Sequence, residues 1–327
     1  MGIIIILLSI LNGFAIGAND AANSFADWIG ARVGKPRTGM FICGTMALLG
    51  AILEGGKVSK TIGGGIVPPE YLTVQIAGIG LLAAICWVIF ATYFGLPVST
   101  THSAVGAVAG IGIALSIPYW TGKSLDFVPI KWNVFQKIVI CWLVTPTASC
   151  LIAFLFYFTL INFLRRFHYE KTFYRWAKVL LTISSSYVAY TWGTNDVANA
   201  VALVSASKVL PIRTACIVGG SAMFLGAVIW GYRVAENVGF NITRLTPIMG
   251  VCADFSCAFV IHFFTQLKIP VSTTHALVGA VAGVGLARGV NVINLKLIRD
   301  IVFAWIATPI LTGIFSIIIF YIFRFLF

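Results

Sequence analysis

Several motifs occur twice in this chain, in the same order, and this duplication limits the folds that the chain can adopt. Three motif pairs carry it: PVSTTH at 97–102 and 270–275, GANDAANSF (17–25) with GTNDVANAV (193–201), and WLVTPTAS (142–149) with WIATPILT (305–312). The duplication predicts a first repeat at 1–164 and a second at 179–327, joined by a charged linker at 165–178.

The long apolar stretches between these motifs predict an all-α polytopic membrane protein. The chain is 59% hydrophobic and 10% charged, whereas soluble domains carry about 25% charged residues. A bilayer-spanning helix needs roughly 20 apolar residues, and a soluble α-protein could not bury this many such stretches. The opening stretch, MGIIIILLSILNGF, has no basic region and no cleavage site, so we interpret it as a first membrane segment.

Each repeat is expected to contain about five apolar segments. These lie near 2–28, 39–54, 71–94, 99–115 and 134–164, and near 179–206, 214–230, 247–266, 271–288 and 300–327. An odd number makes the second copy enter the membrane from the opposite side. The repeats are then inverted and related by a pseudo-two-fold axis in the membrane plane, an arrangement typical of secondary transporters.

The basic residues predict the orientation. The linker 165–178 carries five Lys and Arg against one Glu, which favours a cytoplasmic linker and places both termini outside the cell membrane. The net charge of +12 is spread between apolar segments, so it suits the lipid bilayer's anionic headgroups rather than a nucleic acid.

The first repeated motif predicts a cation site. It brings an acid and two amides to membrane depth, where a charged Asp is costly and faces a cavity or a partner. An unwound turn here would also free backbone carbonyls, and hard cations such as Na⁺ choose oxygen ligands. A polar network that only holds helices together is the alternative. The candidate cation ligands are Asn19, Asp20, Asn23, Asn195, Asp196 and Asn199.

The second repeated motif predicts an anion site. Three hydroxyl residues precede a short apolar helix, so each copy is interpreted as a half-helix that begins inside the membrane. Such an N-terminus offers unpaired N–H groups and the positive end of the helix dipole. Ordinary capping explains one hydroxyl, not three in both repeats. The candidate anion contacts, which would meet at the membrane midplane, are Ser99, Thr100, Thr101, Ser272, Thr273 and Thr274.

Charge balance links the two sites. Neither motif contains Lys or Arg, and a helix end supplies only about half a charge. An oxyanion bound here would need cations bound beside it. The residues therefore predict cation-coupled symport of a small tetrahedral oxyanion.

The sequence resembles a known family, the inorganic phosphate transporter (PiT) family. The resemblance rests on GANDAAN, GTNDVAN and both PVSTTH copies, together with GGKVSKTIGGGIV and GYRVAENVGFNITRLTP. It implies a homodimer that moves phosphate with Na⁺ or H⁺, without any other cofactor. It also implies ion ligation by the Asn and Asp residues above and phosphate contact by the Ser and Thr residues. The linker lacks the large insertion of the animal members.

The sequence offers further candidate residues and leaves other functions open. His102 and His275 could carry protons or hold the half-helices by bonding a backbone carbonyl. Asp254 has no mate in the first repeat and either binds a further cation or pairs with a neighbour. A sulfate permease of the same family is the alternative. An intramembrane metalloenzyme is remote, because there are only four His and no HExxH motif, so we expect neither an enzyme nor a transition metal.

Overall fold

The computed structural model describes residues 1–93, 98–120, 130–232, 246–289 and 295–326, which form helices and no strand. The first repeat holds α1 (Gly2–Gly30), α2 (Pro36–Glu54), α3 (Gly56–Gly64), the 3-10 turn η1 (Pro69–Tyr71), α4 (Val74–Tyr93), α5 (Thr100–Trp120) and α6 (Trp132–Arg166). The second holds α7 (Glu170–Ala206), α8 (Ile212–Gly226) with its π-helical continuation η2 (Ala227–Gly231), α10 (Pro247–Gln266), α11 (Thr273–Arg288) and α12 (Leu295–Leu326). Pro97 and most of the GYRVAENVGFNITRLTP motif lie outside the described residues.

The all-α polytopic membrane fold is confirmed. Eight of the described helices are long and apolar enough to cross a bilayer. With 16 residues, α11 is about 24 Å long and does not reach across a core of about 30 Å. It is therefore a half-helix, as the sequence predicts. Its counterpart α5 has 21 residues and is long enough to cross, so by length the prediction is wrong for α5.

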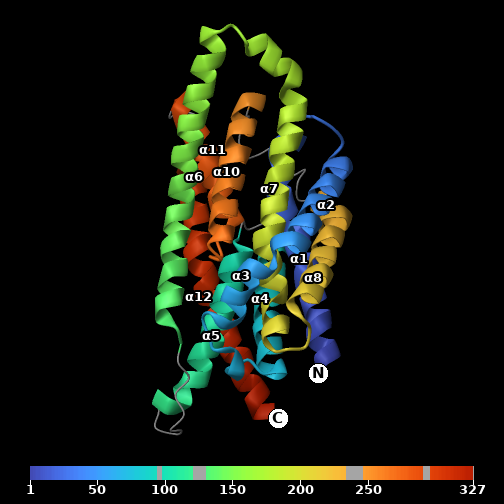
Figure 1. Cartoon of the computed structure of the whole chain (residues 1–327). Helices are drawn as coiled ribbons and strands as arrows, with labels where there is room; N and C mark the ends of the chain where they lie inside the picture. Colours follow the sequence, from blue (N-terminus) through green and yellow to red (C-terminus); the bar gives the residue numbers. More distant parts are fainter. Residues whose placement is uncertain (94–97, 121–129, 233–245, 290–294, 327) are drawn as a thin grey trace.

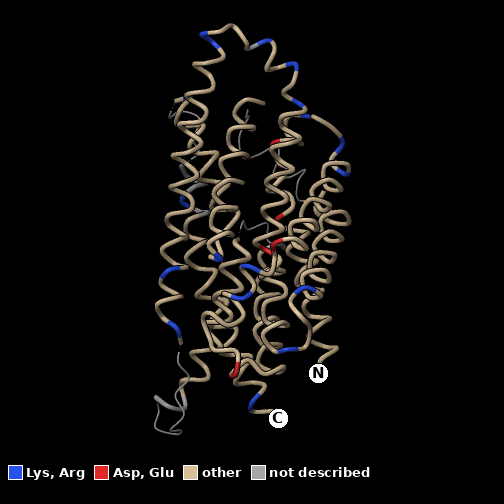
Figure 2. Tube along the Cα trace, viewed as in Figure 1, with Lys and Arg blue, Asp and Glu red and all other residues tan. Residues whose placement is uncertain are grey.

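The two termini lie at one end of the molecule, and the turn between α6 and α7 lies at the other (Figure 1). Figure 1 also shows α6 and its counterpart α12 running in opposite directions, as inverted repeats require. Lys and Arg gather at the α6–α7 turn (Figure 2). Within the predicted linker, only 167–169 separates the two helices.

The first helix of each repeat packs against the second helix of the other repeat, α1 on α8 and α7 on α2. A Cβ at Gly17 of α1 would lie 2.1 Å from the carbonyl oxygen of Met223 on α8. A Cβ at Gly193 of α7 would lie 2.0 Å from the carbonyl oxygen of Ala47 on α2. The two contacts are equivalent positions of the duplicated sequence. Glycine is needed here because two backbones touch, and both helix pairs join one repeat to the other.

Helices α5 and α11 also need glycine where their backbones touch a neighbouring helix. A Cβ at Gly106 of α5 would lie 2.4 Å from the carbonyl oxygen of Pro309 on α12, and one at Gly279 of α11 would lie 2.2 Å from that of Pro146 on α6. The N-terminal ends of α5 and α11 meet inside the bundle, where Thr101 Oγ1 donates to the Val271 carbonyl at 3.2 Å. The packing thus brings both PVSTTH copies to one place.

The unwound turn considered for the first motif is absent. Helix α1 is continuous through Asn19 and Asp20, and α7 is continuous through Asn195 and Asp196. Since the backbone carbonyls stay within the helices, the side chains supply the oxygen atoms of the site.

Candidate functional site

Helices α1 and α7 bring two acids into the interior. Asp20 and Asp196 are 2% and 0% exposed. Polar contacts fasten the two helices to each other on the same stretch. Ser9 Oγ donates to the Ala200 carbonyl at 2.9 Å, and Asn12 Nδ2 donates to the Asn199 carbonyl at 3.0 Å. The acids therefore sit on a rigid, buried framework.

The serines of the second motif cap their own helices. Ser99 Oγ accepts from the backbone N–H of His102 at 3.2 Å, and Ser272 Oγ accepts from that of His275 at 3.3 Å. This is N-cap geometry, and it fixes where α5 and α11 begin. Each serine hydroxyl hydrogen stays available to a ligand at the helix end.

The threonines touch the acids directly. Thr100 Oγ1 donates to Asp20 Oδ2 at 2.7 Å, and Thr273 Oγ1 donates to Asp196 Oδ2 at 3.1 Å. Thr101 Oγ1 lies 3.3 Å from Asp196 Oδ1 as well as near the Val271 carbonyl, and its single hydrogen can serve one of them at a time. The predicted anion contacts and cation ligands thus form one cluster, built by α1, α5, α7 and α11.

The amides hold this cluster together. Asn195 donates to Asp196 and to the Val271 carbonyl, and its own oxygen accepts from the Val271 N–H at 3.3 Å. Asn199 Nδ2 donates to Thr101 Oγ1 at 3.1 Å and lies 3.3 Å from that of Thr100. Asn195 therefore positions the chain before α11, whereas the buried Oδ1 of Asn199 has no partner among the described residues and is open to a cation.

Asn12 is a site residue that sequence reasoning missed. It is 1% exposed, and its Oδ1 is buried without a partner among the described residues. Its equivalent in the second repeat is Val188, so a search for repeated motifs passes over it. The available signal was a lone amide within the apolar run LLSILNGF.

Of the four remaining candidates, Asn19, Asn23 and Thr274 lie on the helices that build the cluster, and Asp254 lies on another helix. Asn19 Nδ2 donates to Asp20 Oδ1 at 3.3 Å, and Asn23 is half-buried further along α1. Thr274 is buried on α11. Asp254 of α10 accepts from Ser184 at 2.9 Å and from Ser185 at 2.7 Å.

The cluster contains two carboxylates and no basic partner. Across the described parts of the chain, no Lys or Arg forms an ion pair with Asp20 or Asp196. Hydroxyls and amides solvate the acids but do not neutralise them, and buried charge of this kind calls for a counter-ion. The donor set is all oxygen, which fits a hard cation.

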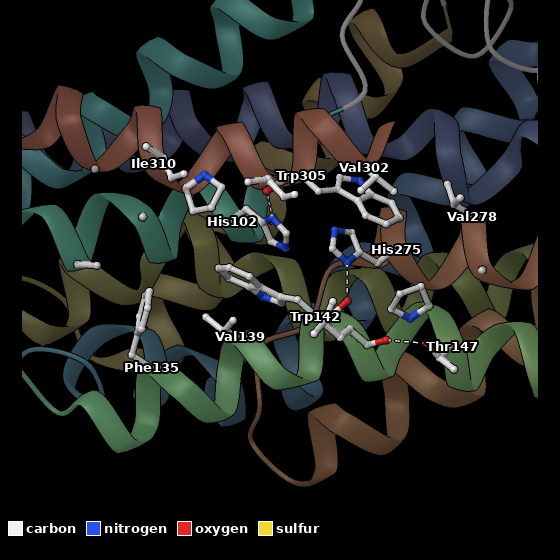
Figure 3. Close-up of a pocket in the computed structure, with 18 of the residues that line it drawn as sticks. His102, Phe135, Val139, Trp142, Thr147, His275, Val278, Val302, Trp305 and Ile310 are labelled. Carbon is white, nitrogen blue, oxygen red and sulfur yellow. Dashed lines mark hydrogen bonds between the residues drawn. The ribbon is translucent and has the colours of Figure 1, made fainter. Parts of the chain in front are cut away.

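The two histidines bond backbone carbonyls. His102 Nδ1 lies 2.9 Å from the Trp305 carbonyl, and His275 Nδ1 lies 3.0 Å from that of Trp142 (Figure 3). Each carbonyl stands four residues before a proline, Pro309 or Pro146, which has no N–H to complete the helical bond. The histidines therefore supply the donor that the prolines remove, and they hold α5 and α11 to their partner helices.

The sequence matches the profile of the phosphate transporter family over residues 16–316. A putative phosphate permease of Pyrococcus furiosus is 34% identical, over 97% of this chain and 95% of its own length. A probable low-affinity inorganic phosphate transporter of Rhizobium meliloti is 30% identical, over 93% and 91%. A solved structure described as the sodium-dependent phosphate transporter superposes with a TM-score of 0.88 at 30% identity, covering 100% of this chain and 99% of that one.

Proposed function

The chain belongs to the phosphate transporter family, and we propose that it is a symporter that moves inorganic phosphate across the membrane together with Na⁺. The sulfate alternative gains no support, since the family and the relatives above are named for phosphate. The same family resemblance argues for a transporter rather than an enzyme.

The contact between the acids and the half-helix hydroxyls carries this proposal. Phosphate bound at Thr100 and Thr273 would stand beside Asp20 and Asp196. Two like charges 4 Å apart repel by about 4 kcal/mol at an effective dielectric constant of 20. Cations bound at the acids remove this repulsion and attract the phosphate instead. Each ligand then raises the affinity for the other, which is the thermodynamic requirement for coupling.

Na⁺ is the first candidate for the coupled ion. Carboxylate, amide and hydroxyl oxygens meet at the cluster, and the structural neighbour is described as sodium-dependent. H⁺ is the second candidate, because protonation of both acids would also remove the repulsion. We propose Na⁺ sites formed by Asp20, Asp196 and the Oδ1 of Asn199, with phosphate at the ends of α5 and α11.

Uptake by the purified chain in proteoliposomes tests this function. Radiolabelled phosphate should accumulate when a Na⁺ gradient is imposed at equal pH, and unlabelled sulfate in excess should not compete. Uptake driven only by a pH gradient would replace Na⁺ by H⁺. No phosphate uptake under either gradient, or faster uptake of labelled sulfate, would reject the proposal.

We also propose a cell-membrane placement with the α6–α7 turn in the cytoplasm and both termini outside, as a homodimer. The shared end of the two termini and the Lys and Arg at the opposite turn support this orientation (Figures 1 and 2). A protease site placed after Phe327 should be cleaved from outside intact cells, whereas one inserted at His168 should be protected. Mass measurement of the purified chain in detergent tests the dimer.

A further inference from the structure

A large apolar cavity lies between α5, α6, α11 and α12. Its volume is about 1270 Å³, and it separates the α5–α12 pair from the α6–α11 pair (Figure 3). Ligand pockets for small molecules measure about 300–1,000 Å³, so this cavity is larger than most of them. His102 lines it, directly after Thr101, which faces the acids. The cavity and the proposed transport site therefore share one turn of α5.

The cavity opens towards the hydrocarbon of the bilayer. Leu143 and Leu151 of α6 line it and are 72% and 58% exposed. Ile306 and Ile310 of α12 line it and are 62% and 56% exposed. Apolar residues that are both exposed and cavity-lining in the middle of membrane helices mark an opening that lipid can enter.

Four rings form the polar middle of the cavity. His102 lies tilted against Trp142 with ring centroids 3.8 Å apart, His275 stacks on Trp305 at 3.5 Å, and the two imidazoles lie 4.5 Å apart. We call these four residues the ring quartet. Figure 3 shows the two histidines side by side between the two tryptophans. The quartet joins the two helix pairs that the cavity otherwise separates.

The ring quartet lines the cavity and holds hydrogen-bonding groups just beneath its wall, which a ligand in the cavity reaches once the rings turn. Because a carbonyl only accepts, the Nδ1 atoms of His102 and His275 must donate, and the Nε2 atoms of the neutral rings are acceptors. Both Nε2 atoms and the indole N–H groups of Trp142 and Trp305 are buried without a partner among the described residues. Both histidines are at least 98% buried, at 1% and 2% exposure. Buried groups of this kind need a partner.

The lining of the cavity restricts what that partner can be. None of the described residues that line it is Lys, Arg, Asp or Glu. A charged phospholipid headgroup would find no ionic partner there, whereas a hydroxyl needs none. A hydroxyl also donates to Nε2 and accepts from an indole N–H, which matches both kinds of unused group.

We propose that this cavity binds a neutral lipid that carries a hydroxyl group, with the hydroxyl at the ring quartet and the hydrocarbon chain along α6 and α12. A water molecule would meet the four nitrogen atoms but gives no account of the long apolar groove that leads to them. The bound lipid bridges the α5–α12 and α6–α11 pairs. The N-terminal ends of α5 and α11 form the proposed phosphate site. The lipid is therefore placed to influence how these pairs move during transport.

Photolabelling of the full chain in phosphatidylcholine nanodiscs tests this site. The probe is hexadecanol with a diazirine in its chain, and the matched probe is the same hydrocarbon without the hydroxyl. The alcohol should label 139–151 and 302–314 about tenfold better than the hydrocarbon, the factor that about one net hydrogen bond supplies. Unlabelled hexadecanol should compete.

Two groove variants and a control sharpen the test. Ala282→Trp fills the groove on α11 without touching the ring quartet and should abolish the labelling. Leu225→Trp, at an apolar and exposed position of α8 outside the groove, should retain it. His275→Phe removes one acceptor and should cancel most of the preference for the alcohol, provided that the variant elutes as the wild type does in size-exclusion chromatography. Should it not, Ala282→Trp decides alone.

Three results would overturn the proposal. Equal labelling by both probes would mean that hydrocarbon alone fills the groove. Labelling of the same peptides by photoreactive phosphatidylcholine as strongly as by the alcohol would assign the site to ordinary phospholipid. Cross-links between two copies of the chain through groove residues would make this face a protein interface. None of these results depends on phosphate uptake, so the lipid site and the transport function fail separately.

Discussion

Thr100 Oγ1 donates a hydrogen bond of 2.7 Å to Asp20. This bond joins the PVSTTH motif of the first repeat to the GANDAANSF motif of the same repeat. In the second repeat, Thr273 makes the equivalent contact with Asp196 at 3.1 Å. The residue that would bind the anion and the residue that would bind the cation are thus already in contact. Phosphate and cation cannot bind independently at such a site, because each changes the charge that the other meets.

The acids should be required for coupled uptake. Asp20→Asn and Asp196→Asn keep the shape of the side chain but remove the charge that holds a cation. Na⁺-driven phosphate uptake in proteoliposomes should fall by about 30-fold or more, since losing one buried charge contact costs about 2–5 kcal/mol. Glu70→Gln, an exposed acid on η1, is the matched control and should transport as the wild type does. An Asp variant with wild-type rate and Na⁺ dependence would show that its acid is structural.

The threonines should act together on phosphate. Each of these hydroxyls has a single hydrogen, which goes to a carboxylate here and can turn to phosphate once cations occupy the acids. Thr100→Val and Thr273→Val are nearly isosteric, and each should weaken phosphate binding in the presence of Na⁺ about ten- to a hundredfold through loss of one hydrogen bond to a charged ligand. Because both contact the same ligand, the double variant should deviate from additivity. Phosphate affinity measured by calorimetry checks this. Thr45→Val, whose hydroxyl bonds its own exposed helix, is the control. Additive effects within error would indicate separate sites.

The close helix contacts should tolerate no methyl group. Gly17→Ala and Gly193→Ala each place a Cβ about 2 Å from a carbonyl oxygen of the neighbouring helix, so the helices must separate. The free energy of unfolding should fall by at least about 1–3 kcal/mol, measured from thermal unfolding in detergent. Gly78→Ala on α4, where a Cβ meets nothing within 4 Å, should instead leave stability unchanged or raise it. Equal midpoints for all three variants would contradict the backbone contact.

The histidines and prolines should be thermodynamically coupled. In Pro146→Ala, the new N–H can bond the Trp142 carbonyl, which then no longer needs His275. His275→Phe should therefore destabilise the wild type by about 1–3 kcal/mol and the Pro146→Ala background by less. A thermal unfolding cycle of the four proteins measures the coupling, and His102 with Pro309 forms an equivalent cycle. A His275→Phe effect of the same size in both backgrounds would exclude this role.

Much of this architecture was predictable because the sequence states it twice. The repeated GAND and PVSTTH motifs predict the half-helix α11 and inverted repeats, and the structure brings Asp20, Asp196 and the threonines together. The continuous course of α1 was not predictable, because Gly17 permits either an unwound turn or a close contact, and only the position of Met223 decides between them.

Two kinds of feature could not be predicted from the sequence for a different reason: residues that occur in only one repeat, and contacts between helices of different repeats. Asn12 has no counterpart, so duplication gives it no emphasis. The bond from His275 to the Trp142 carbonyl depends on which helix lies beside α11, and local patterns carry no information about pairing across more than a hundred residues. The apolar face of α6 looks the same in sequence whether it meets lipid or a neighbouring helix.

The pairing of helices from different repeats has a consequence for how the protein is made. While the ribosome still holds the second repeat, α2 lacks α7, and α6 lacks α11, so Gly50 and Pro146 face lipid or the insertion machinery. The first repeat therefore completes its packing only when the second repeat is in place, and a product that ends after α6 leaves these helix surfaces uncovered.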